Sequence, residues 1–394
     1  METSKTNNRY LLWCLSAFSA TAVASISLQN LIWVAVLIFF YLRFRSKELI
    51  NWPKGLFPFA TLLFLSTFFL GALVGVDPAN SFHTVHKYLT FLMIFPLGAM
   101  ALGAQEIKKL LLIFISGTAF CSIYGIGKHF FLHEDRIDSF SGDKMVFGGL
   151  LMAGLLLTIW FLKNSPKNIW LWAGFMLILS ALVLTQTRGA WIGAFAGFFL
   201  FSWRYNRKWL LAAAILIALA FFMMPTSLQN RVKSITDLNI SYDGNQQIAN
   251  SSQPRLLIWL SGMKIIKDYP WGIGQGNISD VFPRYRLMAL NLYEPTVPHL
   301  HNNFLQVLVQ NGWIGLIAFL FWIFSYYKTA LSRQETTNES DGLNWIFLCV
   351  FSAVLVWGLT EYTFSHQFMN VQFFLLGLQL NYWALIKPNP LVSH

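Results

Sequence analysis

The sequence has too few charged residues to cover a water-soluble protein of its size. Only 11% of its 394 residues are Asp, Glu, Lys or Arg, whereas soluble domains carry roughly 25%. Hydrophobic residues make up 56% of the chain, and the mean hydropathy is +0.52. A soluble protein of two or three domains is therefore excluded, and most of the surface is expected to contact lipid.

Cysteine is also scarce, and a nucleotide-binding motif is missing. Cys14, Cys121 and Cys349 each lie in an apolar run, where a free thiol behaves as a small hydrophobe. This excludes a secreted fold held together by disulfides. No Gly-Lys-Ser/Thr follows the glycines at 272, 274 and 276. We therefore interpret these glycines as a turn that gives the chain freedom to move, and not as a phosphate-binding loop.

Long apolar runs without interior charges are abundant. Twelve of them can span a bilayer, and in lipid such runs satisfy their backbone polar groups only as helices. We therefore predict an all-α polytopic membrane protein with about 12 transmembrane helices. The runs lie near residues 10–28, 30–42, 56–75, 88–104, 110–127, 146–162, 169–185, 189–203, 209–224, 303–326, 344–362 and 367–386.

Basic residues are distributed unevenly between the two sides of these spans. With a cytoplasmic N-terminus, the inner segments carry 16 Lys and Arg against 6 acidic residues, and the outer segments carry 12 against 11. Because basic residues favour the cytoplasmic side, both termini are predicted to be cytoplasmic. The net charge of +11 then reflects topology, and no nucleic-acid partner is predicted.

The N-terminal segment permits two interpretations. Lys5, Arg9, an apolar stretch and Ala22-Val23-Ala24 before Ser25 resemble a secretory signal peptide with its cleavage site. The next apolar run begins almost immediately, so we favour an uncleaved first span. The remaining topology is the same in both cases.

One long outer loop, residues 225–302, separates the ninth and tenth spans. We expect a single polytopic domain, 1–394, with this periplasmic loop as a subdomain that contains short helices. Apolar residues at helical spacing predict an amphipathic helix from Arg255 to Lys267, and Pro254 just ahead of it is a start signal.

Five ionisable residues are predicted at the outer ends of the helices and could share one outward-facing pocket: Arg136, Arg188, Arg255, His301 and Glu361. No Asp, Glu, Lys or Arg lies in the middle of a predicted span, so these are the residues that hydropathy does not explain. Arg136 has three acidic neighbours that could simply pair with it.

Two of these arginines occupy positions that membrane topology alone does not favour. Arg188 lies in an outer turn, where the positive-inside bias opposes a cation; snorkelling to lipid headgroups is the alternative. Arg255 falls in the first turn of the predicted loop helix, where a cation is disfavoured unless an anion also binds there. Guanidinium matches two oxygens of a diphosphate. An ion pair with Asp243 or Asp268 is the alternative for Arg255.

His301 is predicted in the first turn of the tenth span, where a neutral imidazole can accept a proton. Glu361 is predicted to end the eleventh span, and Arg188, Arg255 or His301 could be its partner. It would then orient the histidine or complete an ion pair.

We do not predict a metal site or any other cofactor. His299 is interpreted as a hydrogen-bonded structural residue. The pairs His299/His301 and His83/His86 lack further ligands nearby in the sequence.

Several motifs together resemble the O-antigen ligase family. They are Thr185-Gln186-Thr187-Arg188, Arg255 ahead of the Asp-Tyr-Pro-Trp-Gly-Ile-Gly turn, and His299-Leu300-His301-Asn302 followed by Gly-Trp-Ile-Gly at 312–315. Asp135-Arg136-Ile137 also resembles the ligase pattern. The chain departs from it at Glu361, where such ligases often have Asp. O-antigen polymerases and protein-glycosylating oligosaccharyltransferases share the superfamily pattern.

The resemblance implies a GT-C-like fold and a metal-independent, inverting glycosyl transfer at the periplasmic face of the Gram-negative inner membrane. The donor would be a polysaccharide on undecaprenyl diphosphate, and the acceptor a sugar hydroxyl of lipid A–core. Arg188 and Arg255 would hold the diphosphate, and His301 would act as general base. Further substrate-binding candidates are Arg136, Gln186 and Asn302.

Three other functions stay open. A polymerase would join lipid-linked repeat units, and an O-oligosaccharyltransferase would modify proteins. A transporter or flippase is the alternative from a different class, but coupled transporters place their sites near the bilayer midplane. Membrane lipid and the two glycolipid substrates are the predicted partners, and the sequence does not fix an oligomeric state.

Overall fold

The computed structural model describes residues 2–45, 52–140, 142–210, 253–287, 297–333, 342–364 and 366–386. Over these ranges the chain is helical and contains no β-strand. Four helices are long and apolar enough to cross a membrane, and shorter apolar helices accompany them. The predicted all-α class is thereby confirmed for the described residues, and the helices are consistent with a polytopic membrane protein, whereas the number of 12 spans stays a prediction.

Most predicted spans coincide with helices, apart from shifts at their ends. The span expected at 209–224 lies outside the described residues, apart from its first two residues. The helices that match predicted spans are α1 (Glu2–Thr21), α2 (Ile26–Arg45), α3 (Leu56–Val74), α6 (Ala104–Leu132), α7 (Lys144–Asn164), α8 (Ile169–Leu184), α9 (Arg188–Tyr205), α14 (Asn303–Ser332), α15 (Leu343–Trp357) and α16 (His366–Leu385).

The span predicted at 88–104 is wrong in its bounds and in its regularity. Asp77 caps α4 (Pro78–Val85) by accepting a hydrogen bond of 3.0 Å from the Asn80 N–H, so the helical segment begins well before residue 88. It continues through the 3₁₀-helix η1 (His86–Met93) and ends with α5 (Ile94–Gly98). Hydropathy does not detect a cap in a polar stretch, and this cap determines where the segment starts.

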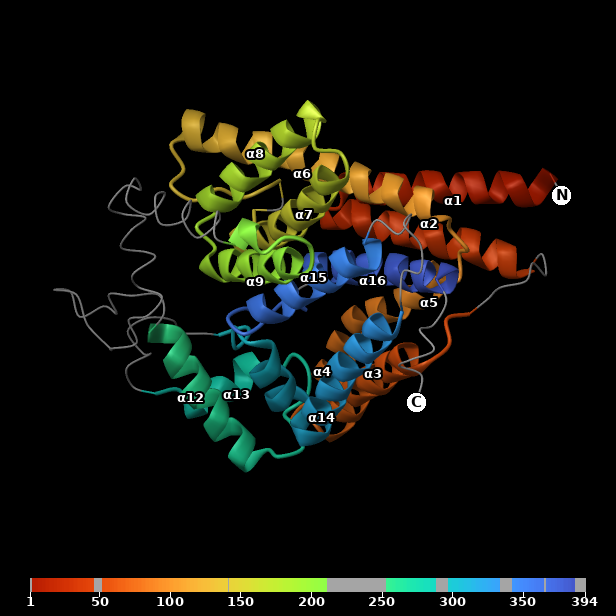
Figure 1. The fold of residues 1–394 in the computed structure, drawn as a ribbon. Coiled ribbons are helices and arrows are strands. Elements are labelled where there is room, and N and C mark those ends of the chain that lie inside the picture. Colours follow the sequence, from red (N-terminus) through yellow and green to blue (C-terminus); the bar gives the residue numbers. More distant parts are fainter. Residues whose placement is uncertain are drawn as a thin grey trace.

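The helix bundle has a central layer made of α15 and α16. One buried apolar cluster joins this layer to α1, α2 and α6 through α9, and a second joins it to α3, η1 and α14. Figure 1 shows α15 and α16 between these two groups of helices. The loop that follows α15 therefore lies where the two groups of helices meet.

Two further helices, α12 (Gln253–Asp268) and α13 (Ile278–Tyr285), belong to the predicted outer loop. They lie at the end of the molecule opposite to the N-terminal end of α1 (Figure 1). A third apolar cluster, which includes Ile265, Phe282 and Val309, packs them against the start of α14. The predicted amphipathic helix at 255–267 is thus present, extended slightly at both ends.

The glycine-rich segment between α12 and α13 is packed against α14. Ile273 N–H donates to the Val309 carbonyl at 2.9 Å, and Gly274 N–H donates to the Gln310 carbonyl at 3.0 Å. Gly272 and Gly312 both have positive φ, and a Cβ on either would collide with the backbone of the other segment. The interpretation as turn glycines is confirmed. The expected freedom of movement is wrong, because these glycines allow two backbones to approach closely.

Candidate active site

The turn between α8 and α9 positions two arginines. Gln186 has a φ of 53°, and its side-chain amide donates to the Asp135 carbonyl at 2.8 Å. Arg136 Nε donates to the Thr185 carbonyl at 3.1 Å. Ile137 N–H also bonds to the Leu184 carbonyl, at 3.2 Å. These bonds hold the segment around Arg136 against the turn that precedes Arg188.

His301 lies just before α14, and not in its first turn as predicted. Asn302 is the N-cap: its Oδ1 accepts from Leu305 N–H at 3.0 Å, and its Nδ2 donates to the Leu359 carbonyl at 2.9 Å. His301 itself has a φ of 49°. Both polar groups of the Asn302 side chain take part in these hydrogen bonds. The bonds hold His301 beside the loop that follows α15.

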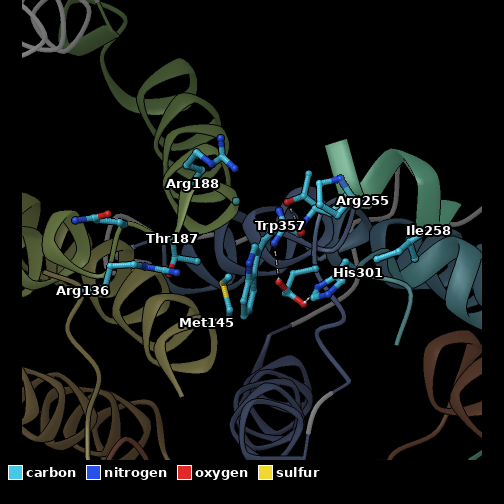
Figure 2. A pocket seen from close by; sticks show the side chains of 13 residues that line it. Arg136, Met145, Thr187, Arg188, Arg255, Ile258, His301 and Trp357 are labelled. Atoms are coloured by element: carbon cyan, nitrogen blue, oxygen red, sulfur yellow. Dashed lines mark hydrogen bonds and ion pairs between the residues drawn. The ribbon is translucent and has the colours of Figure 1, made fainter. Parts of the chain in front are cut away.

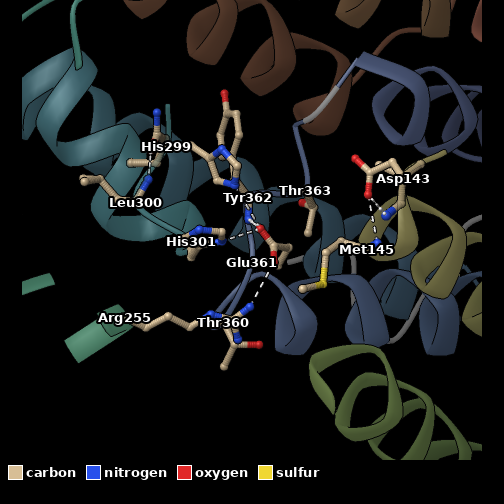
Figure 3. A network of polar contacts seen from close by, with 12 residues as sticks. Asp143, Met145, Arg255, His299, Leu300, His301, Thr360, Glu361, Tyr362 and Thr363 are labelled. Atoms are coloured by element: carbon tan, nitrogen blue, oxygen red, sulfur yellow. Dashed lines mark hydrogen bonds and ion pairs between the residues drawn. The ribbon is translucent and has the colours of Figure 1, made fainter. Parts of the chain in front are cut away.

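Glu361 lies in that loop, beyond the end of α15, and not at the end of a helix as predicted. The residue is only 4% exposed. Its Oε1 lies 2.8 Å from His301 Nδ1 and 3.2 Å from His299 Nε2, and it accepts from Tyr362 N–H at 3.1 Å. Its Oε2 accepts from Arg255 Nη2 at 3.2 Å (Figure 3). Of the three partners predicted for Glu361, the structure therefore provides Arg255 and His301.

These contacts fix the protonation of the carboxylate. Burial raises the pKa of Glu361, but the hydrogen bonds of His299 and His301 and the charge of Arg255 lower it, and this pKa lies well below its usual range. Glu361 is therefore ionised at neutral pH and can only accept hydrogen bonds. A neutral His301 that donates from Nδ1 keeps its lone pair on Nε2.

Six of the seven predicted site residues line one cavity of about 200 Å³. Arg136 and Arg188 lie on one side, Arg255 and His301 lie on the other, and Trp357 lies between them (Figure 2). The seventh, Asn302, does not line it. The lining residues are Arg136, Met145, Gln186, Thr187, Arg188, Gly189, Pro254, Arg255, Ile258, His301, Trp357, Thr360 and Glu361.

The charge of this lining is strongly positive. Three arginines face one carboxylate, and all four side chains come from segments that are far apart in the sequence. Such a cavity attracts an anion, and guanidinium groups suit phosphate oxygens in particular. The fold thus brings the three arginines, His301 and Glu361 together in one cationic pocket, and its outward orientation stays a prediction.

Three of the acidic residues considered as partners for Arg136 and Arg255 also contact other groups. Among the acidic neighbours of Arg136, Asp138 and Glu134 lie 2.5 Å and 3.1 Å from Lys128 Nζ. Asp268, the alternative partner of Arg255, accepts a hydrogen bond of 2.7 Å from the Tyr285 hydroxyl. Asp243 lies outside the described residues.

His299, His301 and Glu361 could also hold a metal ion, because their ligand atoms lie within 4.8 Å of one another. No further ligand lies nearby in the sequence, as expected, but the fold supplies a third one: Glu361, from 60 residues away. However, Arg255 shares this carboxylate, and Arg136 and Arg188 line the same cavity. Their charges repel a divalent cation.

Sequence reasoning missed several residues of the site. His299 is not among them: it is interpreted as a hydrogen-bonded structural residue, and it does contact Glu361. Trp357, Thr360 and Met145 line the cavity, but in the sequence they belong to the ends of apolar runs. These three residues line the cavity because of tertiary packing, which a local sequence pattern does not show.

Comparisons with known proteins confirm the predicted resemblance. Residues 173–320 match the family described as O-Antigen ligase. Over 247 residues, 58% of this chain, the sequence is 29% identical to a general O-oligosaccharyltransferase of Acinetobacter baylyi. The match covers 41% of that protein's length. The segment matched to the family contains Arg188, Arg255 and His301, whereas Arg136 and Glu361 lie outside it.

Proposed function

We propose that this chain is a glycosyltransferase of the O-antigen ligase type. It transfers a polysaccharide from undecaprenyl diphosphate to a sugar hydroxyl of lipid A–core, with inversion at the anomeric carbon. The observation that carries the proposal is the shared cavity: three arginines and a His301–Glu361 pair line it together. The similarity of residues 173–320 to O-antigen ligases supports it independently.

His301 is the general base. Its Nδ1 faces Glu361 Oε1 at 2.8 Å, so the carboxylate orients the ring and stabilises the imidazolium that forms. Nε2 takes the proton from the acceptor hydroxyl as its oxygen attacks the anomeric carbon. This type of proton transfer contributes about 10²–10⁴-fold to a rate.

The arginines act on the leaving group. As the new glycosidic bond forms, the bond from the anomeric carbon to the phosphate oxygen breaks, and the diphosphate keeps the electron pair. Arg188 and Arg255 hold the diphosphate and stabilise its growing charge, and Arg136 and Gln186 assist from the same side of the cavity as Arg188. Asn302 contributes indirectly, because its cap fixes His301.

The reaction needs no metal ion in this proposal. Three guanidinium groups supply the positive charge that a divalent cation would otherwise supply, and Arg255 already engages Glu361. Transfer is therefore expected to be insensitive to EDTA.

The active site belongs to the periplasmic face. The distribution of basic residues supports about 12 spans with both termini in the cytoplasm and residues 225–302 as a periplasmic loop within one polytopic domain. A donor that is already attached to a lipid diphosphate reaches such a site by diffusion in the membrane, without a nucleotide.

The first prediction concerns transfer by the purified protein, reconstituted with a lipid-linked donor and lipid A–core. His301→Ala is expected to lower the transfer rate by about 10²–10⁴-fold, because the base is lost. Arg255→Ala is expected to lower it comparably, because charge stabilisation is lost. His83→Ala is the matched control: His83 is an exposed histidine that does not line the cavity.

Each alternative function has its own outcome in this assay. Chain growth with donor alone would identify a polymerase, and labelled glycan on an added acceptor protein would identify an O-oligosaccharyltransferase. Flux of lipid-linked glycan that survives the loss of His301 would identify a transporter. Near-wild-type transfer by both variants would refute the assigned roles.

A further inference from the structure

Trp357 carries a buried hydrogen-bond donor without a partner. The residue is 1% exposed, and its indole Nε1 has no acceptor among the described residues. Most buried polar groups are paired, and leaving one unpaired costs stability. The indole also lines the cationic cavity. A donor kept unpaired at such a position indicates a ligand that accepts from it.

The packing around Trp357 holds the indole in place. On α7, Gly149 has no room for a Cβ, because the six-membered ring of Trp357 occupies that space. On α9, a Cβ on Gly193 would lie 3.2 Å from Trp357 Cβ. On the other side the ring packs edge-on against Phe368, with centroids 4.8 Å apart. The N–H therefore points in a fixed direction.

The indole lies beside the beginning of α9. A Cβ on Gly189, the second residue of α9, would lie 2.8 Å from Trp357 Cδ1 and 3.3 Å from Nε1. The N-cap Thr187 makes no side-chain hydrogen bond to the first turn. Backbone N–H groups in a first helical turn lack intrahelical partners and favour an anion. Gly189 itself lines the cavity, and the Thr360 hydroxyl and the Trp357 indole pack against the position that its Cβ would occupy.

We propose that Trp357 Nε1–H and the first turn of α9 form a phosphate-binding subsite, between the Arg136/Arg188 side and the Arg255/His301 side of the cavity. Both components only donate hydrogen bonds, so they suit the unprotonated oxygens of a phosphate group. The inference rests on the proposed function, because it assigns one phosphate of the lipid diphosphate to this position.

The subsite gives Trp357 a role distinct from that of the arginines. Guanidinium groups on flexible side chains follow a phosphate as it moves, whereas the indole N–H and the helix start are fixed by packing. Such preorganised donors select the position of the leaving diphosphate relative to His301. Trp357 is therefore a binding residue of the donor site.

The second prediction concerns binding of inorganic pyrophosphate and of geranylgeranyl diphosphate to the full-length protein in detergent, measured by titration calorimetry. Trp357→Phe keeps an aromatic ring and removes the N–H. It is expected to weaken both affinities at least about tenfold, the effect of one hydrogen bond to a charged acceptor. Replacing Trp357 with benzothienylalanine, which keeps the two-ring shape without the N–H, is expected to weaken them equally.

Trp33→Phe is the matched control. Trp33 is also buried, its Nε1 also lacks a partner within the described part of the chain, and it packs against Phe18 and Phe374 away from the cavity lining. The Trp33→Phe variant is expected to bind both diphosphates with the same affinities as the wild type. If Trp33→Phe weakens binding as much as Trp357→Phe, the loss reflects packing, and the subsite is overturned.

The two proposals fail in different ways. If the wild type binds neither diphosphate, the proposed donor is wrong, and the subsite falls with it. If Arg255→Ala weakens binding but both Trp357 replacements bind like the wild type, the subsite alone is overturned. In ¹⁵N-tryptophan-labelled protein, pyrophosphate is expected to shift the indole N–H resonance that Trp357→Phe removes. An unshifted resonance contradicts the subsite.

Discussion

At the scale of single residues, Glu361 organises the candidate site. Its two oxygens contact Arg255 from α12 and the histidines that precede α14, so one side chain connects three segments. The side chain is long enough to make these contacts from a position beyond the end of α15. A buried carboxylate with several donors is stabilising only while all of them stay in place.

The third prediction concerns the pH dependence of stability. The pKa of Glu361 is lowered in the folded protein, so its ionised form contributes stability above the ordinary value of 4.5, and this contribution is lost as the pH falls below it. Glu361→Gln is expected to lower the free energy of unfolding by about 1–3 kcal/mol above this value. The measurement is thermal unfolding in detergent at a series of pH values.

The difference in Tm between wild type and Glu361→Gln is expected to narrow as the pH falls further below 4.5. Glu134→Gln is the control, because Glu134 pairs with Lys128 at a partly exposed position outside the cavity. A difference in Tm between wild type and Glu361→Gln that grows as the pH falls would contradict the assignment of an ionised Glu361 carboxylate.

The sequence predicted which side chains share the cavity better than the contacts between them. Arg136, Arg188, Arg255, His301 and Glu361 were identifiable because polar side chains at the ends of apolar runs need a reason to be there. The partner of each was not identifiable. Which donor reaches Glu361 depends on how α12 packs on α14, and a sequence pattern contains no such distance.

At the scale of elements, α14 connects the cavity to the loop. Its first half carries the Asn302 cap and receives the turn at 270–277, and Gly312 interrupts the helix with a φ of 66°. At this interruption Trp313 N–H donates to the Pro270 carbonyl at 3.2 Å. The interruption of α14 at Gly312 therefore leaves space for the turn at 270–277.

The fourth prediction tests this contact. Gly312→Ala is expected to destabilise the protein by at least about 1–2 kcal/mol, because a Cβ at positive φ is strained and would collide with the Trp271 backbone. It is also expected to weaken transfer, because α12 carries Arg255. Thermal unfolding and the transfer assay measure the two effects.

Gly174→Ala is the control for this substitution. Gly174 lies within α8, has open space around its Cβ position, and is expected to gain about 0.5–1 kcal/mol from the better helix former. A Gly312→Ala variant as stable as Gly174→Ala would show that the turn does not need close backbone approach.

The elements predicted well are those with long apolar runs, such as α7 and α16. The errors occur where a cap or a turn decides the boundary. Asp77 starts α4 before the apolar run, and Asn302 delays α14 past His301. Hydropathy is averaged over a window of residues that is longer than a helix cap, so it does not show where a cap starts a helix.

At the scale of the whole molecule, the loop helices lie at the end of the bundle away from the N-terminal end of α1 (Figure 1), and α12 contributes Pro254, Arg255 and Ile258 to the cavity lining. The central α15 and α16 layer contributes residues to two apolar clusters, and the cavity is lined by Trp357 from the first of them and by Ile258 from the cluster of the loop helices. An active site at one end of such a bundle requires a fixed orientation in the membrane.

The fifth prediction tests that orientation. In a background with Cys14, Cys121 and Cys349 replaced by Ala, Ser279→Cys in α13 is expected to react with an impermeant maleimide on intact spheroplasts. Ser165→Cys, in the turn between α7 and α8, is expected to react only after permeabilisation. Both positions are exposed, so accessibility depends on the side of the membrane. If Ser165→Cys reacts on intact spheroplasts and Ser279→Cys reacts only after permeabilisation, the proposed topology is wrong and the opposite orientation holds.

The docking of residues 270–277 on α14 has a consequence for inhibition. The same loop segment continues from α12, which carries Arg255, and it is anchored by backbone bonds to Val309 and Gln310. A small molecule or antibody fragment that separated these two segments would move Arg255 away from Glu361 without occupying the cavity. Such inhibition would be allosteric, and under the proposed topology the inhibitor would act from the periplasm without crossing the inner membrane.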